Sequence, residues 1–172
     1  MTLRNLSLFF ISLLILAACG GGGGGSNTPP PTAGCSPSTT NLCITVVGGK
    51  YVVQNSSSAG VSQKTLTLNA GTYTFDQTDS SNVTAAGAYG SARIHQIGFS
   101  TTSDGTFGGG STYSTGVNTS GSPGSTGKTT IVIDASTPST HYYYCVNHTG
   151  MGGTINIVIG NQSDQVEFTE TN

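Results

Sequence analysis

One stretch near the C-terminus says more about the fold than any other, YYYCVNHTGMGG at residues 142–153. Three tyrosines precede Cys145, and aromatic residues are favoured in β-strands. The asparagine and the glycines that follow are typical of tight turns. The stretch therefore predicts a strand that ends at Cys145, a tight loop that carries His148, and a last strand that begins near Met151.

The rest of the chain repeats this strand-and-turn character. Several segments alternate apolar and polar residues with a period of two, which is typical of half-buried strands. In one of them Leu66 and Leu68 share a face. Residues 105–127 are almost entirely Gly, Ser and Thr, which predicts a long loop or an irregular edge hairpin around Tyr113. The predicted strands are residues 44–47, 50–54, 64–69, 72–75, 93–100, 129–134, 142–145 and 154–159.

Short strands separated by turns, without a long segment of helical spacing, predict an all-β domain. With about seven to eight strands it would be a sandwich or a barrel. We assign this domain to residues 35–160 and a C-terminal tail to residues 161–172. The composition agrees, because Gly, Ser and Thr dominate and there are seven Tyr and no Trp.

The charge excludes a nucleic-acid-binding protein. Only 7% of the 172 residues are charged, and the formal net charge is −2. Five Lys and Arg residues in all cannot neutralise a phosphate backbone.

The N-terminus has the features of a targeting segment. Arg4 precedes an apolar run at residues 8–16, which is too short for a bilayer span of about 20 residues and suits a signal peptide. The run ends in LAAC at residues 16–19, which resembles the bacterial lipobox. The resemblance implies cleavage after residue 18, a lipid on Cys19, and a place in the cell envelope. The alternative is an ordinary secretory signal with a chance cysteine at position 19.

Residues 19–34 are predicted to be a disordered tether. Six glycines are followed by a polar segment and by Pro29, Pro30 and Pro31. Glycine-rich chains are flexible, and consecutive prolines stiffen the far end. The lipid is then the protein's only contact with the membrane, on the periplasmic face, the outer membrane or the cell surface. Gly20 after the cysteine favours the outer membrane by analogy.

The cysteines divide into a close pair and a single residue. Cys35 and Cys43 flank a short polar loop and are interpreted as a local disulfide in an oxidising compartment. The alternative is a second metal site, although no histidine lies near them in the sequence. Cys145 remains unpaired. An unpaired thiol in an exported protein would be oxidised or cross-linked unless it binds a ligand such as a metal ion.

The residues around Cys145 supply further ligands for such a metal ion. A thiolate, an imidazole and a thioether come within a few residues at Cys145, His148 and Met151, and His95 offers a second imidazole. Two histidines and one cysteine in a trigonal set, with a weak axial methionine, define a blue-copper site. We therefore predict one type 1 copper ion. A zinc site and a metal-free domain are the alternatives.

At this point the sequence resembles the cupredoxin family, to which plastocyanin and amicyanin belong. The spacing Cys-x-x-His-x-x-Met matches the short ligand loop of amicyanin, and the likeness covers roughly residues 44–160. It implies a Greek-key β-sandwich or barrel. It also implies that His95 is the upstream ligand, Cys145 the thiolate, His148 the second imidazole and Met151 the axial ligand.

Three positions depart from the family pattern. An Asn usually follows the upstream His and a Ser or Thr follows the Cys, linking the ligand loops, whereas this chain has Gln96 and Val146. We expect the Gln96 amide to reach a backbone group of the ligand loop instead; the alternative is that Gln96 faces solvent. His141 stands where the family commonly has Tyr, and we expect it to be a structural hydrogen-bonding residue rather than a ligand.

The predicted site does not suit an enzyme. Its four protein ligands leave no open position for a substrate, and Asp76, Asp79 and Asp104 are interpreted as solvated turn residues. One-electron transfer between redox partner proteins of the cell envelope is the favoured function. Copper storage or delivery is one alternative, and a metal-free surface module is the other.

Overall fold

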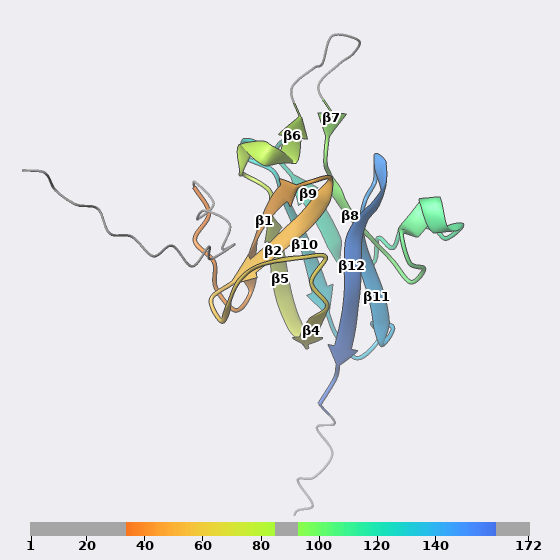
Figure 1. Ribbon diagram of the computed structural model, residues 1–172. Helices are drawn as coiled ribbons and strands as arrows, with labels where there is room; N and C mark the ends of the chain where they lie inside the picture. Colours follow the sequence, from red (N-terminus) through yellow and green to blue (C-terminus); the bar gives the residue numbers. More distant parts are fainter. Residues whose placement is uncertain (1–33, 85–92, 161–172) are drawn as a thin grey trace, which may run out of the picture.

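The computed structural model describes residues 34–84 and 93–160, and this part of the chain forms a β-sandwich. Figure 1 shows the two larger sheets packed face to face, with a small two-stranded sheet at one end. The predicted signal peptide, Cys19, residues 19–33 of the tether and the tail at 161–172 lie outside the described residues. The structure thus confirms the all-β prediction.

The larger sheet has six strands in the order β3-β2-β1-β5-β10-β9. Its hairpins are antiparallel, but β1 pairs with β5 in parallel. The bounds are β1 Asn41–Val47, β2 Lys50–Asn55, β3 Ser58–Ser62, β5 Gly71–Asp76, β9 Val117–Ser120 and β10 Lys128–Ile133.

The second sheet has four strands in the order β4-β12-β11-β8. Strands β11 and β12 form a hairpin, and β12 pairs with β4 in parallel. The bounds are β4 Leu66–Asn69, β8 Ile97–Ser100, β11 Thr140–Cys145 and β12 His148–Val158. The remaining elements are β6 Val83–Thr84, β7 Arg93–Ile94, and the short 3-10 helices η1 Ser80–Asn82 and η2 Gly105–Gly108.

The core lies between the two large sheets and draws on both. Phe75 of β5 meets Phe99 of β8 edge-on, with ring centroids 5.1 Å apart, and also packs against Tyr143 of β11 at 6.0 Å. All three side chains have an exposed fraction of 0%. Burial of such large apolar surfaces is the main driving force for folding, so these contacts hold the sheets together.

Two parts of the predicted strand pattern were wrong. The structure has twelve strands in its described part rather than seven to eight. The sequence did not predict β3, β6, β7 and β9 as separate strands, because they are short and mostly exposed. The predicted strand at residues 93–100 is broken at His95 and Gln96, where the backbone makes other hydrogen bonds.

The predicted loop at residues 105–127 is partly ordered. It contains η2 and the edge strand β9, which pairs antiparallel with β10. Tyr113 is joined to Phe99 by an isolated bridge instead of forming the centre of a hairpin. None of the helices in residues 34–84 and 93–160 is long and apolar enough to cross a membrane.

Candidate metal centre

The β11–β12 hairpin brings two of the predicted ligands together. Cys145 ends β11 and His148 begins β12, and they are cross-strand partners on either side of the turn formed by Val146 and Asn147. Cys145 is fully buried and is the only free cysteine among the described residues. His148 is half-buried, so it lies between the buried Cys145 sulfur and the protein surface.

The third ligand comes from the break between β7 and β8. The backbone of His95 is fixed there on both sides: its N–H donates to the carbonyl of Asn82 at 2.9 Å, and its carbonyl accepts from the Tyr51 hydroxyl at 3.0 Å and from the Gln77 amide. The His95 side chain is 6% exposed, and its Nε2 lies 3.0 Å from the Thr84 hydroxyl. A proton on Nε2, donated to Thr84, leaves the Nδ1 lone pair free for a metal.

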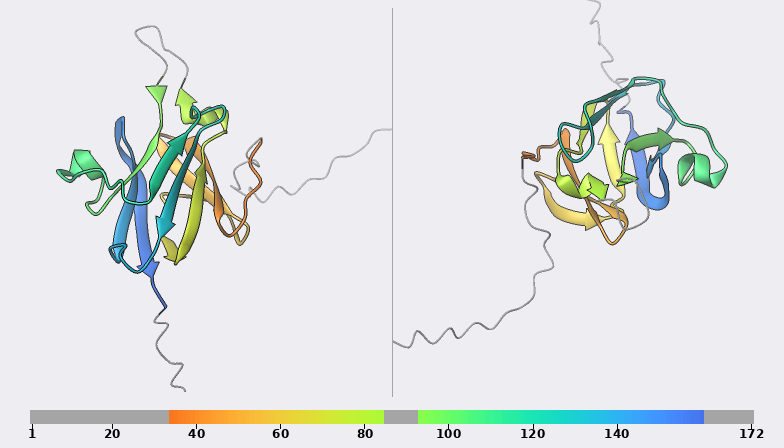
Figure 2. Two further views of the ribbon diagram at one scale, coloured as in Figure 1. Left: turned by 180° about the vertical axis from the view of Figure 1, so that it is seen from behind. Right: turned by 90° about the horizontal axis from the view of Figure 1, so that it is seen from above.

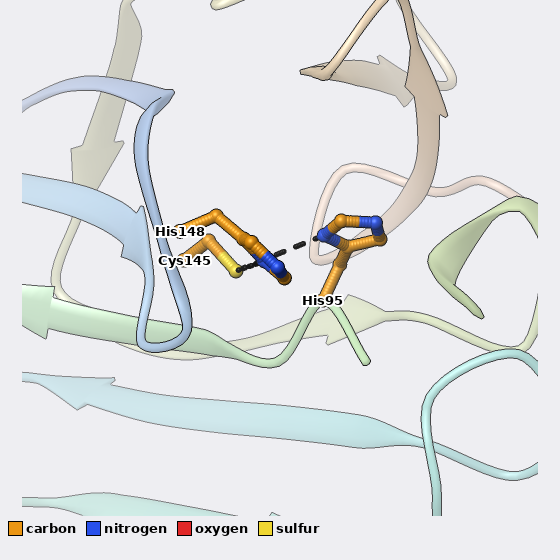
Figure 3. Close-up of side chains that lie close together, drawn as sticks. All are labelled: His95, Cys145 and His148. Carbon is orange, nitrogen blue, oxygen red and sulfur yellow. Dashed lines mark hydrogen bonds between the residues drawn. The ribbon is translucent and has the colours of Figure 1, made fainter. Parts of the chain in front are cut away.

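These three side chains converge on one point, as Figure 3 shows. The Cys145 Sγ lies 3.5 Å from the Nδ1 of His148 and 3.9 Å from the Nδ1 of His95. All three ligand atoms lie within 4.8 Å of one another. Ligand atoms about 2.0–2.3 Å from a shared ion, at trigonal or tetrahedral angles, are about 3.3–4.0 Å apart. The residues therefore fit a bound metal ion.

The electrostatics of the cluster favour an unprotonated His95. Burial lowers the pKa of His95, and the electrostatic effect of the nearby His148 and Arg93 side chains lowers it further. Only a neutral imidazole offers a lone pair to a metal, because a protonated ring has no free nitrogen. The surroundings therefore keep His95 in the form that a metal site requires.

Met151, the fourth predicted ligand, is buried in the apolar core. Its side chain is 2% exposed and belongs to the apolar core cluster that also contains Cys145. The burial suits both a core residue and an axial thioether. Its role as a ligand stays a prediction, whereas the other three residues are brought together.

The two ligand loops are linked, but not by the predicted group. The N–H of Val146 donates to the backbone carbonyl of Gln96 at 3.0 Å, and the Asn147 amide donates to the carbonyl of Ile94 at 2.7 Å. The Gln96 amide points elsewhere and donates to Gln77 Oε1 at 3.1 Å and to the Thr129 hydroxyl at 2.7 Å. The expectation that this amide reaches the ligand loop was wrong.

His141 has the structural role predicted for it. Its ring is fully buried, its Nδ1 lies 3.0 Å from the carbonyl of Pro138, and it packs edge-on against Tyr113 at 4.4 Å. The ring packs against Tyr113 and is not part of the cluster of possible ligands.

The interpretation of the three aspartates as solvated turn residues was wrong for two of them. Asp76 is 3% exposed and forms an ion pair with Lys128 at 3.2 Å. Burial raises the pKa of its carboxyl, but hydrogen bonds from Thr78 and the charge of Lys128 outweigh this and lower the pKa overall. Asp104 binds the ligand loop through Gly150. Asp79 caps η1 by accepting from the N–H of Ser81 at 2.9 Å.

Sequence reasoning also missed the polar residues that hold His95. Gln77 and Asn82 are fully buried, and each hydrogen-bonds to the other and to the backbone of the ligand segments or of β1. Buried amides of this kind are required to be hydrogen-bonded. Nothing in the local sequence distinguishes them from surface amides, because their partners lie far away along the chain.

No family model matches this chain, and no curated protein matches it significantly. The fold and the cluster together define a class: an all-β protein with a buried site of two histidines and one cysteine that can hold a metal ion.

Proposed function

We propose that this protein is an exported, lipid-anchored type 1 copper protein of the cupredoxin kind. It would transfer single electrons between redox partner proteins of the cell envelope. One observation carries the proposal: a buried thiol and two imidazole nitrogens converge within 3.5 and 3.9 Å. No other set of His, Cys, Asp and Glu side chains in the described residues has this geometry.

The donor set favours copper over other ions. A soft thiolate and, with Met151, a thioether select copper, and imidazole suits it in both oxidation states. Structural zinc sites use four strong nitrogen or sulfur donors in a tetrahedron. Here three strong donors are assembled and the fourth predicted donor is a weak one. This is the combination found in blue-copper sites.

The setting of the ligands favours electron transfer over catalysis. Cys145 and His148 lie on one hairpin, and both backbone groups of His95 are hydrogen-bonded. A bound copper ion would supply the chemistry by gaining one electron and losing it again, from Cu²⁺ to Cu⁺ and back. Ligands held in place need little rearrangement between the two states. The half-buried ring of His148 is the part of the site that a partner protein can approach.

The location is part of the proposal. Cys19 would carry the lipid, and the glycine- and proline-rich residues after it would let the domain reach partners near the membrane. Both lie outside the described residues, so this part rests on the sequence alone.

Reversible redox chemistry tests the function. Purified protein is loaded with one equivalent of Cu²⁺ and titrated potentiometrically, and a chelator is then added. We expect one reversible one-electron wave and slow loss of copper to the chelator. Rapid exchange with the chelator, without a reversible wave, would favour copper storage or delivery. A protein that takes up no copper would favour a metal-free surface module.

A further inference from the structure

The loop between His148 and Met151 is poorly supported by its own hairpin. The pairing of β11 and β12 jumps from Tyr143–Gly153 to Cys145–His148. Four residues, 149–152, therefore stand opposite Tyr144 alone. A segment with so few cross-strand partners needs other contacts to hold it in one conformation.

Asp104 supplies such contacts from outside the hairpin. One oxygen of its carboxylate accepts from the N–H of Gly150 at 2.8 Å, and the other accepts from the Thr149 hydroxyl. Asp104 stands at the position that precedes η2, yet its side chain does not cap that helix. The carboxylate accepts hydrogen bonds from the ligand loop instead.

Two further side chains bind the other side of the same loop. The Lys50 ammonium donates to the carbonyl of Gly150, and the Gln63 amide donates to the carbonyls of Gly150 and Gly152 at 3.2 and 2.7 Å. An anion thus binds the N–H of Gly150 while a cation binds its carbonyl. Hydrogen bonds to charged groups are the stronger kind, so both peptide groups that flank Gly150 are held.

The backbone conformation of Gln63 and Asp104 indicates that their contacts with the ligand loop have a function. Within the described residues, Gln63 and Asp104 are the two non-glycine residues with positive φ, at 46° and 58°. Such conformations cost free energy for residues with a side chain, and they gather at functional positions. Gly150 itself has a φ of 71°, which glycine adopts freely.

We infer that Asp104, Lys50 and Gln63 form a clamp on the Thr149–Gly150 segment that positions His148 and Met151 at the metal centre. The inference rests on the proposed copper function. The clamp joins the ligand loop to β2, to the segment after β3 and to η2, none of which carries a ligand. Asp104 is a positioning residue in this scheme, since it acts on the metal only through the loop.

The test uses variants that separate the carboxylate from its backbone. Asp104→Gly removes the carboxylate but keeps the positive φ without strain. Asp104→Asn keeps one acceptor oxygen and tolerates the same conformation. Thr149→Val removes only the hydroxyl. Asp134→Ala is the matched control, because the Asp134 carboxylate also accepts an N–H and a hydroxyl, both from Ser136, but in the loop between β10 and β11.

Each variant is measured without metal and with copper. Without metal, hydrogen exchange of the Gly150 amide reports whether the loop is held. With copper, the rate of release to a chelator, the reduction potential and the EPR spectrum report on the centre. Loss of an outer-shell partner typically costs about 10–100-fold in metal affinity or activity.

We expect Asp104→Gly to expose the Gly150 amide, to speed copper release by about 10–100-fold and to shift the potential. Asp104→Asn and Thr149→Val should fall between it and the parent, and Asp134→Ala should match the parent. Unchanged release and potential in Asp104→Gly would overturn the inference alone, as would an unchanged Gly150 amide. A parent protein that binds no copper would overturn the proposed function, and the inference with it.

Discussion

The sulfur of Met151 gives a test of the metal centre at the scale of one residue. Leucine has nearly the same volume, so Met151→Leu should keep the core packed at a cost below about 1.5 kcal/mol. The axial bond in a blue-copper site is long and weak and chiefly tunes the potential. We expect the variant to bind copper with its colour retained and its potential shifted. A potentiometric titration measures the shift, and an unchanged potential would make Met151 a core residue only.

The ligands could be predicted from the sequence for residue-specific reasons. Cys145 and His148 are close in the chain, so their spacing carries the signal, and His95 followed because the ligand set needs a second imidazole, a role that the family likeness also implies. The structure brings these three side chains together. The clamp could not be predicted, because Asp104 and Gly150 are far apart in the sequence and look like ordinary loop residues there.

Among the secondary-structure elements, the alternating strands were the predictable ones. In β4 and β10 buried positions alternate with exposed or half-buried ones, as a period of two requires, and Leu66, Leu68, Ile131 and Ile133 are among the buried residues. Strand β9 has the sequence VNTS and is almost wholly exposed, so it has no such pattern. Strand β8 is buried at every position and shows no alternation, yet it lies within the strand predicted at residues 93–100. Their pairing depends on neighbours that the local sequence does not specify.

The Gln77 side chain hydrogen-bonds to several segments of the fold, so its replacement should lower the stability of the whole domain. Its side chain accepts from the N–H of Ile97 at 3.0 Å and donates to Asn82 Oδ1 at 3.1 Å and to the carbonyl of His95. Gln77→Met keeps the shape but takes this partner from the Ile97 N–H and from Asn82 Oδ1, each at about 1–3 kcal/mol, while the His95 carbonyl keeps the Tyr51 hydroxyl. We expect the free energy of unfolding of the metal-free protein to fall by about 2–4 kcal/mol, with weaker copper binding.

Chemical denaturation measures the effect of Gln77→Met. Gln54→Met, at a half-buried position in β2, is the control and should change the free energy of unfolding by about 0.5 kcal/mol or less. A loss below about 1 kcal/mol in Gln77→Met would mean that Gln77 does not support the His95 segment.

The disulfide belongs to the six-stranded sheet and should matter to stability rather than to the metal. Cys43 lies in β1 and is bonded to Cys35, with a Cα–Cα distance of 5.9 Å and a separation of 8 residues. So small a loop stabilises by about 3 kcal/mol or less. We expect Cys35→Ser combined with Cys43→Ala to lower the melting temperature but to leave the copper affinity unchanged. If copper uptake is lost while the fold persists, the pair belongs to the site.

At the scale of the whole molecule, the candidate site and the last residues of β12 lie apart. The β11–β12 turn and the β6–β7 pair are at one end of the sandwich, and β12 leaves at the opposite end (Figures 1 and 2). The site is thus built where two sheets end, from the turn of a hairpin and from a break between strands. Such positions carry functional side chains on a rigid scaffold.

The lipid on Cys19 is the prediction about where this molecule is found. The LAAC sequence at residues 16–19 ends a short apolar run that follows Arg4. Mass spectrometry of the mature protein should find an acylated Cys19 as the first residue, and Cys19→Ser should yield a protein without the lipid. An unmodified Cys19 inside a longer chain would refute the anchor, without affecting the metal centre.

The most direct test of the central claim is the absorption and EPR spectrum of the protein with one equivalent of Cu²⁺, recorded beside Cys145→Ser. The buried thiolate of Cys145, with His95 and His148, should give an intense visible band and an EPR signal for one copper per chain. In Cys145→Ser the band should disappear, because a hydroxyl cannot replace the soft thiolate. A colourless copper-treated parent, or colour that survives in Cys145→Ser, would contradict the account.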